Sequence, residues 1–314
     1  MNKIILAIDG GATKTAMTVR DNEGFEFYSA TTTGTNYQAI GEKTVTEVLT
    51  NLLTDAANNL HDWHIDAAVF AIAGIDTTID LEIVQGIVKR SIAGSPLKIE
   101  RYVVENDVEA TLKGLTSNQP GALLISGTGA IAFSYDGKSL QRAGGWGHRA
   151  GDEGSGYWVG QQVARAIFKA ADGRGSHTTL TALVLGELQF ENAEQLYNYL
   201  YNDSYTNARL ASLGSMLQGA YELGDMVAND IAQLAAVELI SLAETIIQHL
   251  NSAQQTLPFY VNGGVLKNNP CIYDRFLTEL EKQYPNVQFQ LCEEQPLYYL
   301  VQRAILLSAD SDPF

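Results

Sequence analysis

The feature that most constrains the fold is an arrangement of three short strands that occurs twice. In each copy a glycine-rich turn follows the first strand and a polar hairpin follows the second. The first copy comprises residues 4–9, 16–20 and 25–30, and the second comprises residues 122–126, 130–135 and 139–143. Asp9 and Ser126 occupy matching places at the ends of the two first strands. We interpret the recurrence as an internal duplication of the fold; the alternative is two unrelated meanders.

Helical patterns alternate with apolar strands after each copy. Residues 67–73 and 99–105 are predicted strands among helices 42–60, 79–92 and a short one from Val108. In the second half, predicted strands 259–262 and 287–291 follow long helical patterns at 155–171, 178–188, 193–201, 210–223 and 225–250, and helices are predicted at 270–283 and 297–307. Fully apolar strands that alternate with helices are typical of parallel sheets covered on both faces. The sequence therefore predicts an α/β protein.

A turn-rich stretch at residues 116–121 marks the expected domain junction. We predict an N-terminal domain over residues 1–118 and a C-terminal domain with helical insertions over residues 119–296. The last segment, 297–314, is expected to fold back onto the first domain. The long helices after Asp225 offer a candidate face for a homodimer or for packing within the chain.

Charge and hydropathy limit the partners. The chain has 36 Asp and Glu against 20 Lys and Arg, a formal net charge of −16. This charge repels phosphate backbones and anionic lipids, so we expect no nucleic-acid or membrane partner. No apolar run approaches the roughly 20 residues that cross a bilayer, and the N-terminus lacks a signal pattern, so we expect a cytoplasmic protein. Cys271 and Cys292 fit two buried, reduced thiols.

The first glycine turn reads Asp9-Gly10-Gly11-Ala12-Thr13-Lys14-Thr15. Gly11 allows close backbone approach, while Thr13 and Lys14 offer a hydroxyl and a cation to a phosphate. Asp9, at the carboxyl end of a strand, is a candidate ligand of Mg²⁺, directly or through water. The Walker A spacing is absent and a strand follows, so the turn would hold a nucleotide as a hairpin. A purely structural polar hairpin is the alternative.

The second glycine turn reads Ser126-Gly127-Thr128-Gly129-Ala130. A strand pattern follows it, which a dinucleotide-binding fold does not have at this place. We interpret it as a second phosphate-gripping turn. Two such turns that face each other would clamp a triphosphate.

These turns, together with the segment Gly-Gly-Trp-Gly-His-Arg-Ala-Gly-Asp-Glu-Gly-Ser at 144–155, resemble the BadF/BadG/BcrA/BcrD-type ATPase family. Within it the chain is most similar to N-acetylglucosamine kinases of the actin and sugar-kinase superfamily. The resemblance implies two ribonuclease H-like domains with ATP and sugar in the cleft between them. It implies ATP-dependent phosphorylation of an amino sugar, foremost N-acetylglucosamine to its 6-phosphate, with Mg²⁺. It also places Thr128 and Gly129 in the second phosphate loop. It makes Gly263, Gly264 and Val265 the adenosine-contacting turn, for which an ordinary strand-to-helix turn is the alternative.

Asp107 is the candidate catalytic residue. It follows the strand 99–105 and precedes the helix predicted from Val108, at the strand edge where ligands bind in parallel sheets. An N-cap of that helix is an equally good explanation from sequence alone. The resemblance implies that this aspartate takes the proton from the attacking sugar hydroxyl.

Short amides and carboxylates suited to vicinal hydroxyls supply the candidate sugar contacts. These candidates are Asn36, Asn106, Gly145, Trp146 and Asp152. Trp146 has the alternative role of a packing anchor. Ser155 is expected to cap the next helix. His148, Arg149 and Glu153 lie in the same segment, and the sequence does not show whether their side chains point toward the substrate.

Three other functions compete with an N-acetylglucosamine kinase. An N-acetylmuramic acid kinase would need a cation near the sugar, which His148 or Arg149 offers. An ATPase activator of an acyl-CoA dehydratase would need cysteines for an iron–sulfur cluster, but both cysteines lie outside the glycine-rich motifs. A non-catalytic sugar sensor would dispense with Asp107 or with the phosphate turns.

Overall fold

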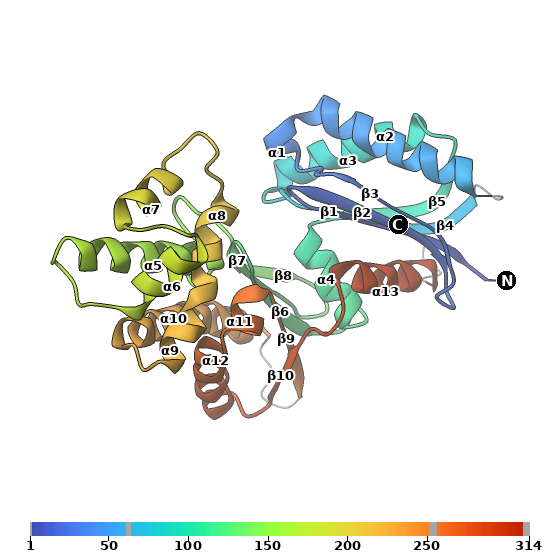
Figure 1. Cartoon of the computed structure of the whole chain (residues 1–314). Coiled ribbons are helices and arrows are strands. Elements are labelled where there is room, and N and C mark those ends of the chain that lie inside the picture. The colour runs from blue at the N-terminus through green and yellow to red at the C-terminus, as the bar shows by residue number, and fades with distance from the viewer. Residues whose placement is uncertain (1, 61–63, 251–255, 310–314) are drawn as a thin grey trace. The chain divides into compact units, whose positions relative to one another are not determined.

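The computed structural model describes residues 2–60, 64–250 and 256–309 (Figure 1). By its contacts the chain divides into two compact units. Unit 1 comprises Met1–Gln119 and Glu293–Phe314, and unit 2 comprises Pro120–Cys292. Each unit contains one five-stranded sheet with helices packed on it.

Unit 1 is built on a mixed sheet in the order β3-β2-β1-β4-β5. Its strands are β1 (Ile4–Gly10), β2 (Lys14–Asp21), β3 (Glu26–Thr33), β4 (His64–Ile72) and β5 (Lys98–Glu105). The first three form antiparallel pairs, whereas β1, β4 and β5 run parallel, with Asp9 opposite Ala71 and Ala71 opposite Glu105. The carboxyl ends of β1, β4 and β5 therefore meet at one edge.

Helices cover both faces of this sheet (Figure 1). They are α1 (Tyr37–Ile40), α2 (Glu42–Asn59), α3 (Thr78–Ala93), α4 (Asp107–Leu115) and α13 (Pro296–Ala309). Leu6 and Ile8 of β1 belong to the core beneath α2 and α3, while Ile5 and Ala7 belong to the core beneath α4 and α13. The alternation of side chains along a strand thus supplies both cores.

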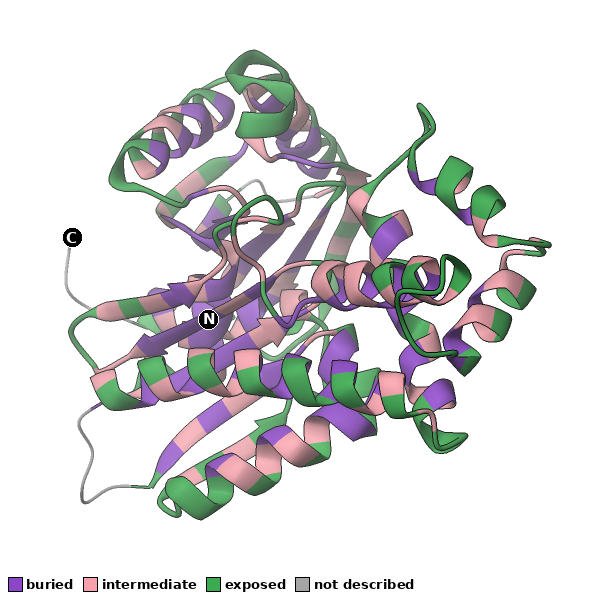
Figure 2. Ribbon diagram, turned by 90° about the vertical axis from the view of Figure 1, so that its left-hand side faces the viewer, coloured by how far each residue is buried: buried purple, intermediate pink, exposed green. Residues whose placement is uncertain are grey.

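Unit 2 has a mixed sheet in the order β10-β9-β6-β7-β8. Its strands are β6 (Gly121–Ser126), β7 (Ala130–Tyr135), β8 (Leu140–Gly144), β9 (Leu257–Asn262) and β10 (Val287–Leu291). Its helices are α5 (Gly156–Ala171), α6 (Thr179–Glu187), α7 (Ala193–Leu200), α8 (Asn207–Ser212), the 3₁₀ helix η1 (Leu213–Met216), α9 (Leu217–Glu222), α10 (Met226–His249), α11 (Gly264–Asn268) and α12 (Pro270–Gln283). Many helices carry buried residues on one side and exposed residues on the other (Figure 2).

The predicted duplication is confirmed by the topology. In unit 2, β6 pairs antiparallel with β7 and parallel with β9, as β1 pairs with β2 and β4 in unit 1. The outer pairs match as well, because β7–β8 is antiparallel like β2–β3, and β9–β10 is parallel like β4–β5. Both units therefore have the predicted ribonuclease H-like sheet.

The single helix predicted over residues 210–223 is wrong. Three short elements, α8, η1 and α9, occupy this stretch. Gly214 has a low helix propensity, and the Ser212 and Ser215 hydroxyls donate to backbone carbonyls three residues earlier, at 2.8 and 2.6 Å. Both effects favour a tighter 3₁₀ turn over a continuous α-helix.

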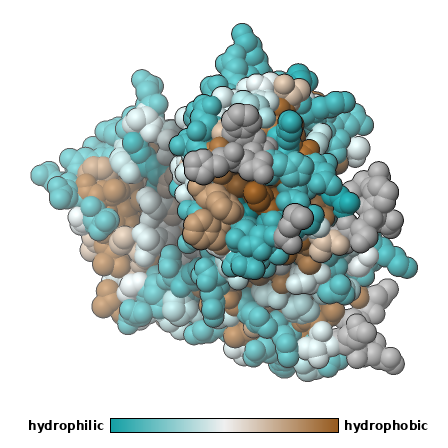
Figure 3. All heavy atoms as spheres, turned by 90° about the vertical axis from the view of Figure 1, so that its right-hand side faces the viewer, coloured by the Kyte–Doolittle hydropathy of each residue, from teal (hydrophilic) through white to brown (hydrophobic). Residues whose placement is uncertain are grey.

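Among the described residues, no helix combines the length and the apolarity that a membrane span requires. On the face shown in Figure 3, hydrophilic residues predominate and hydrophobic ones form patches among them. This distribution agrees with the strongly acidic composition.

Candidate active site

The first glycine turn joins β1 to β2 in unit 1. It closes through a hydrogen bond from Gly11 N to the carbonyl of Lys14 at 3.0 Å, and Thr13 and Lys14 are exposed. Burial raises the pKa of Asp9 at the end of β1, and the charge of Lys14 partly opposes that shift. The turn therefore presents a hydroxyl and an ammonium group beside a half-buried carboxylate.

A second segment braces this turn and carries Asn36. Thr35 N donates to the Gly11 carbonyl at 3.0 Å, and the buried hydroxyls of Thr15 and Thr35 lie 3.0 Å apart. Asn36 caps α1, because its Oδ1 accepts from Gln38 N at 3.0 Å. Within the described part of the chain, its Nδ2 has no hydrogen-bond partner. The structure thus places Asn36 next to the first glycine turn, with one amide donor available.

Asn106, and not Asp107, caps α4. The Asn106 Oδ1 accepts from Val108 N at 2.9 Å and from Glu109 N at 3.4 Å, while its Nδ2 donates to the Ile75 carbonyl at 3.2 Å. Asp107 is the first residue of the helix and is half-buried. The alternative role of Asp107 as the N-cap is therefore wrong, and the carboxylate at this strand edge is not needed for capping.

Other carboxylates influence Asp107. Burial raises its pKa to about 6, and the negative charges of Asp9 and then Asp76 add to that effect, against opposing backbone hydrogen bonds. Three carboxylates from β1, the loop after β4 and the start of α4 are thus close enough to interact. Carboxylate oxygens are the type of donor that Mg²⁺ prefers.

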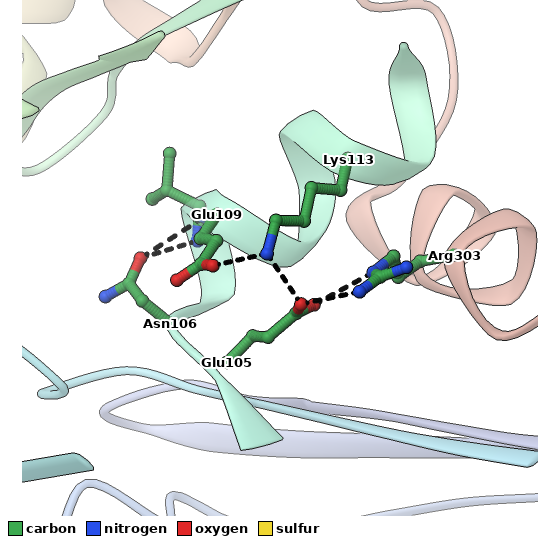
Figure 4. Close-up of polar contacts among 6 residues, drawn as sticks. Glu105, Asn106, Glu109, Lys113 and Arg303 are labelled. Carbon is green, nitrogen blue, oxygen red and sulfur yellow. Dashed lines mark hydrogen bonds and ion pairs between the residues drawn. The ribbon is translucent and has the colours of Figure 1, made fainter. Parts of the chain in front are cut away.

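A buried ion-pair network fixes the strand end that leads to Asp107 (Figure 4). Glu105, the last residue of β5, accepts from Arg303 of α13 at 2.8 and 3.1 Å and from Lys113 of α4 at 2.9 Å. Lys113 also contacts Glu109 at 2.6 Å. The side chains of Arg303 and Glu105 are 7% and 8% exposed. Burial alone would raise the pKa of Glu105, but these cations lower it, so the carboxylate stays ionised.

The second glycine turn lies in unit 2 against the N-terminus of α5. Gly156 N donates to the Gly127 carbonyl at 2.7 Å, and Tyr157 N to the Thr128 carbonyl at 3.2 Å. Ser155 caps α5 as predicted, with its side chain accepting from Trp158 N. The buried Ser126 hydroxyl donates to the Gly154 carbonyl at 2.9 Å. The turn and the segment 144–155 are therefore one connected structure.

The predicted adenosine turn lies beside it. Gly263 has φ +102°, and a Cβ there would meet the Ser126 carbonyl oxygen at 2.1 Å, so only glycine fits this approach of β9 to β6. A cavity of about 340 Å³ lies within unit 2. Its walls include Gly127, Thr128, Gly156, Ala211, Gly264 and Val265. The second glycine turn and the predicted adenosine turn thus line one cavity within unit 2.

Of the sugar candidates in unit 2, Trp146 is 70% exposed, so its alternative role as a packing anchor is wrong. The Arg142 guanidinium lies 4.7 Å from its ring centroid, and Arg142 donates to the carbonyls of Gly144 and Gly145. Arg142 therefore supports the loop that contains Gly145 and Trp146.

Asp152 lies beside the second turn. Its Oδ1 accepts from Gly147 N at 3.3 Å, and a Cβ at Gly129 would meet its Oδ2 at 3.0 Å. Burial raises its pKa, and hydrogen bonds from the Gly147 and Ala130 backbone oppose the shift. The structure thus brings Asp152 and Gly129 together.

The structure also shows the surroundings of His148, Arg149 and Glu153 in the segment 144–155. The His148 ring lies 5.0 Å from that of Tyr157, and its Nδ1 is 3.0 Å from Asn207 Nδ2. Arg149 and Glu153 are exposed.

Sequence reasoning missed Asp76, Ala211, Arg142 and the Glu105–Arg303 pair. Asp76 and Ala211 follow no motif. The available signal for the other two was a charged residue in or at the end of a strand, Arg142 in β8 and Glu105 at the end of β5.

The fold and the two glycine turns define an ATPase of the duplicated ribonuclease H-like class. The family model of the BadF/BadG/BcrA/BcrD ATPase family matches residues 6–292. The chain belongs to this family, as the motifs predicted.

Similar proteins were found among curated sequences and solved structures. An N-acetylmuramic acid/N-acetylglucosamine kinase of Clostridium acetobutylicum is 32% identical over 290 residues, covering 91% of this chain and 93% of that protein. An N-acetyl-D-glucosamine kinase of Dictyostelium discoideum is 28% identical over 301 residues, covering 91% and 92%. A solved structure from Chromobacterium violaceum has a TM-score of 0.71 at 22% identity and covers 96% of this chain and 99% of that one, which supports the fold.

Proposed function

We propose that this chain transfers the γ-phosphoryl group of ATP to an N-acetylated amino sugar, foremost to the 6-hydroxyl of N-acetylglucosamine. The observation that carries the proposal is that the Asp107 carboxylate does not cap α4. A half-buried carboxylate stands at the carboxyl edge of β5, while its neighbour Asn106 does the capping. The identity of 32% to a kinase of amino sugars, over 91% of the chain, supports the same conclusion.

Asp107 acts as the general base. A pKa of about 6 lets it be ionised at neutral pH and still accept a proton from the attacking hydroxyl. Such assistance contributes roughly 10²–10⁴-fold to the rate. The Glu105 network holds the end of β5, and the Asn106 cap holds the start of α4, so both sides of Asp107 are fixed.

The nucleotide is bound by glycine-rich backbone, threonine hydroxyls and the ammonium group of Lys14. Gly11, Thr13 and Lys14 in unit 1 and Thr128 and Gly129 in unit 2 contact the phosphates. Gly263, Gly264 and Val265 contact the adenosine, in keeping with the cavity that Thr128, Gly264 and Val265 line. Asp9 would hold Mg²⁺, directly or through water, and a bound Mg²⁺ would supply charge neutralisation of the phosphoryl oxygens.

The proposed sugar-binding groups are Asn36 in unit 1 and Gly145, Trp146 and Asp152 in unit 2. Asn36 offers its available Nδ2 donor, Asp152 a carboxylate, and Trp146 an exposed ring next to Gly145. The side-chain amide of Asn106 is already hydrogen-bonded within unit 1. Asn106 therefore contributes to the site by fixing the position of Asp107.

The test is ADP release from Mg²⁺-ATP with N-acetylglucosamine, N-acetylmuramic acid, N-acetylmannosamine and glucose. Wild-type protein is compared with Asp107→Asn and with the matched control Glu42→Gln, which also removes an acid from the first turn of a unit 1 helix. We expect turnover with an amino sugar, lost in Asp107→Asn and kept in Glu42→Gln. Equal activity of the Asp107→Asn variant would refute the proposal.

N-acetylmuramic acid is a second candidate acceptor, because the relative from Clostridium acetobutylicum is named for both sugars. Its lactyl carboxylate needs a cation, and Arg149 is exposed in the segment 144–155. If Arg149 binds that carboxylate, Arg149→Ala lowers kcat/KM for N-acetylmuramic acid about tenfold and leaves N-acetylglucosamine unchanged.

The cysteines do not support the alternative function, an ATPase activator of an acyl-CoA dehydratase. Cys271 and Cys292 are the two cysteines of the whole sequence, and both are buried. An iron–sulfur cluster bridging two chains needs accessible thiolates.

A further inference from the structure

Asp80, in the first turn of α3, does more than cap its own helix. It is 8% exposed and forms a capping box with Thr77, in which its Oδ2 accepts from Thr77 Oγ1 at 2.6 Å and Thr77 N at 2.7 Å. Asp76 N donates to the same oxygen at 3.2 Å. These contacts satisfy the helix terminus through one carboxylate oxygen.

The other oxygen contacts a different element, the helix α1. Asp80 Oδ1 accepts from the Tyr37 hydroxyl and from Gln38 Nε2, the latter at 3.3 Å. Burial alone would raise the pKa of Asp80, but the hydrogen bonds from Thr77, Tyr37 and Gln38 lower it to about 2. The carboxylate is therefore ionised at every working pH and attracts these donors strongly.

Tyr37 and Gln38 directly follow Asn36, the sugar candidate. Gln38 N donates to Asn36 Oδ1, and Gln38 Nε2 donates to the Gly74 carbonyl at 3.1 Å. The Asn36 amide packs against Gly74, where a Cβ would lie 2.7–2.9 Å from its three terminal atoms. Gly74 has φ +89°, so this close approach requires glycine. The amide of Asn36 is thus held by its own helix and by the loop after β4.

That loop also reaches the segment of Asp107, because the Ile75 carbonyl accepts from Asn106 Nδ2. Asp80 therefore contacts two segments. One is α1, which Asn36 caps. The other is the loop after β4, which contacts both Asn36 and the cap that precedes Asp107.

We propose that Asp80 and Tyr37 are positioning residues for sugar recognition: the Asp80 carboxylate, acting through Tyr37 and Gln38, fixes the Asn36 amide in the orientation that binds the acceptor sugar. This inference rests on the proposed kinase function. Neither residue touches the sugar or the phosphates. The expected consequence is a loss of sugar affinity without a comparable loss of nucleotide affinity.

Tyr37→Phe is the principal variant, because it removes one hydroxyl and keeps the ring and the capping box. Asp80→Asn is the second variant. Thr77→Ala is the matched control, because it breaks the capping box and leaves the contacts of Tyr37 and Gln38 with Oδ1 in place. For each protein, KM for N-acetylglucosamine, KM for ATP, kcat and the thermal midpoint are measured.

We expect Tyr37→Phe to raise the sugar KM about tenfold, with the KM for ATP and kcat changed by less than about twofold. The double variant Tyr37→Phe/Asp80→Asn should raise the sugar KM no further than Asp80→Asn alone, because both residues act through one contact. Thr77→Ala should lower the thermal midpoint and leave the sugar KM unchanged.

The outcomes separate the inference from the function on which it rests. Wild-type protein that turns over no amino sugar overturns the proposed function, and this inference with it. Wild-type turnover together with an unchanged sugar KM in Tyr37→Phe overturns the inference alone. Equal increases in the KM values for sugar and ATP also overturn it, because they indicate a general loss of structure. Should Asp80→Asn fail to fold, Tyr37→Phe still decides the question.

Discussion

Replacing Asp107 by Asn should stabilise the protein while it abolishes turnover. The folded state raises the pKa of Asp107 from 3.8 to about 6 through burial and through the charges of Asp9 and Asp76. A carboxyl group whose pKa is raised by folding favours the folded state when it is protonated. That stability is fully present below the unfolded pKa and is lost as pH rises through about 6.

The magnitude follows from the shift. A difference of about two pKa units, at about 1.4 kcal/mol each, corresponds to about 3 kcal/mol when the group is fully ionised. Asp107 is half-buried, so solvent screening reduces this value, and we expect about 1–3 kcal/mol. Asparagine has the shape of the neutral acid at every pH. The Asp107→Asn variant should therefore match wild-type stability only below about pH 3.8, show roughly half of its full gain at pH 5, and exceed wild type by about 1–3 kcal/mol at pH 8.

The assay is urea unfolding of both proteins between pH 5 and 8, without nucleotide and with a chelator, because a cation at Asp9 would favour ionised Asp107. The Glu42→Gln variant is the control, and its difference from wild type should not depend on pH in this way. An Asp107→Asn variant that is no more stable than wild type at pH 8 would refute the reasoning. An equal gain at pH 5 and pH 8 would also refute it, since the gain would then have another cause.

Four further predictions concern the same machinery. Arg303→Met leaves Glu105 with one cation and should lower the free energy of unfolding by about 3–5 kcal/mol, whereas Arg303→Met/Glu105→Leu should recover most of it in urea titrations. Gly263→Ala forces a Cβ against Ser126 and should abolish binding of a fluorescent ATP analogue. Gly74→Ala should raise the sugar KM in the coupled assay by displacing Asn36. Chelation of divalent cations should stop ADP release, and added Mg²⁺ should restore it.

The sequence predicted the strands and the duplicated topology because both depend on local patterns. Alternating and fully apolar runs define strands, and the glycine turns mark where they end. The helix at residues 210–223 was predicted wrongly because Gly214, Ser212 and Ser215 weaken an otherwise apolar helical pattern, and packing then decides the outcome.

The candidate site was predictable only where its residues stand in glycine-rich motifs. Asp9, Thr13 and Thr128 belong to such motifs, whereas Asp76 lies in a loop without a recognisable signal. The respective roles of Asn106 and Asp107 also needed coordinates. Both residue types are good N-caps, and the distinction depends on the hydrogen bonds from Val108 N and Glu109 N to Asn106 Oδ1.

The two copies of the sheet differ where their chemistry would require it. In unit 1 the edge carries Asp9 near the end of β1 and Asp107 after β5, and the charge of Asp9 adds to the rise in the pKa of Asp107 that burial causes. In unit 2, β6 matches β1 and β9 matches β4. Ser126, in the place of Asp9, is uncharged and donates to a backbone carbonyl, and Asn262 ends β9 and accepts from Gly263 N at 2.9 Å. A first strand that ends without a carboxylate accommodates an anionic nucleotide at lower electrostatic cost, whereas one that ends with a carboxylate suits a cation. This difference between the duplicated strand ends supports the proposal that the two units perform different parts of phosphoryl transfer.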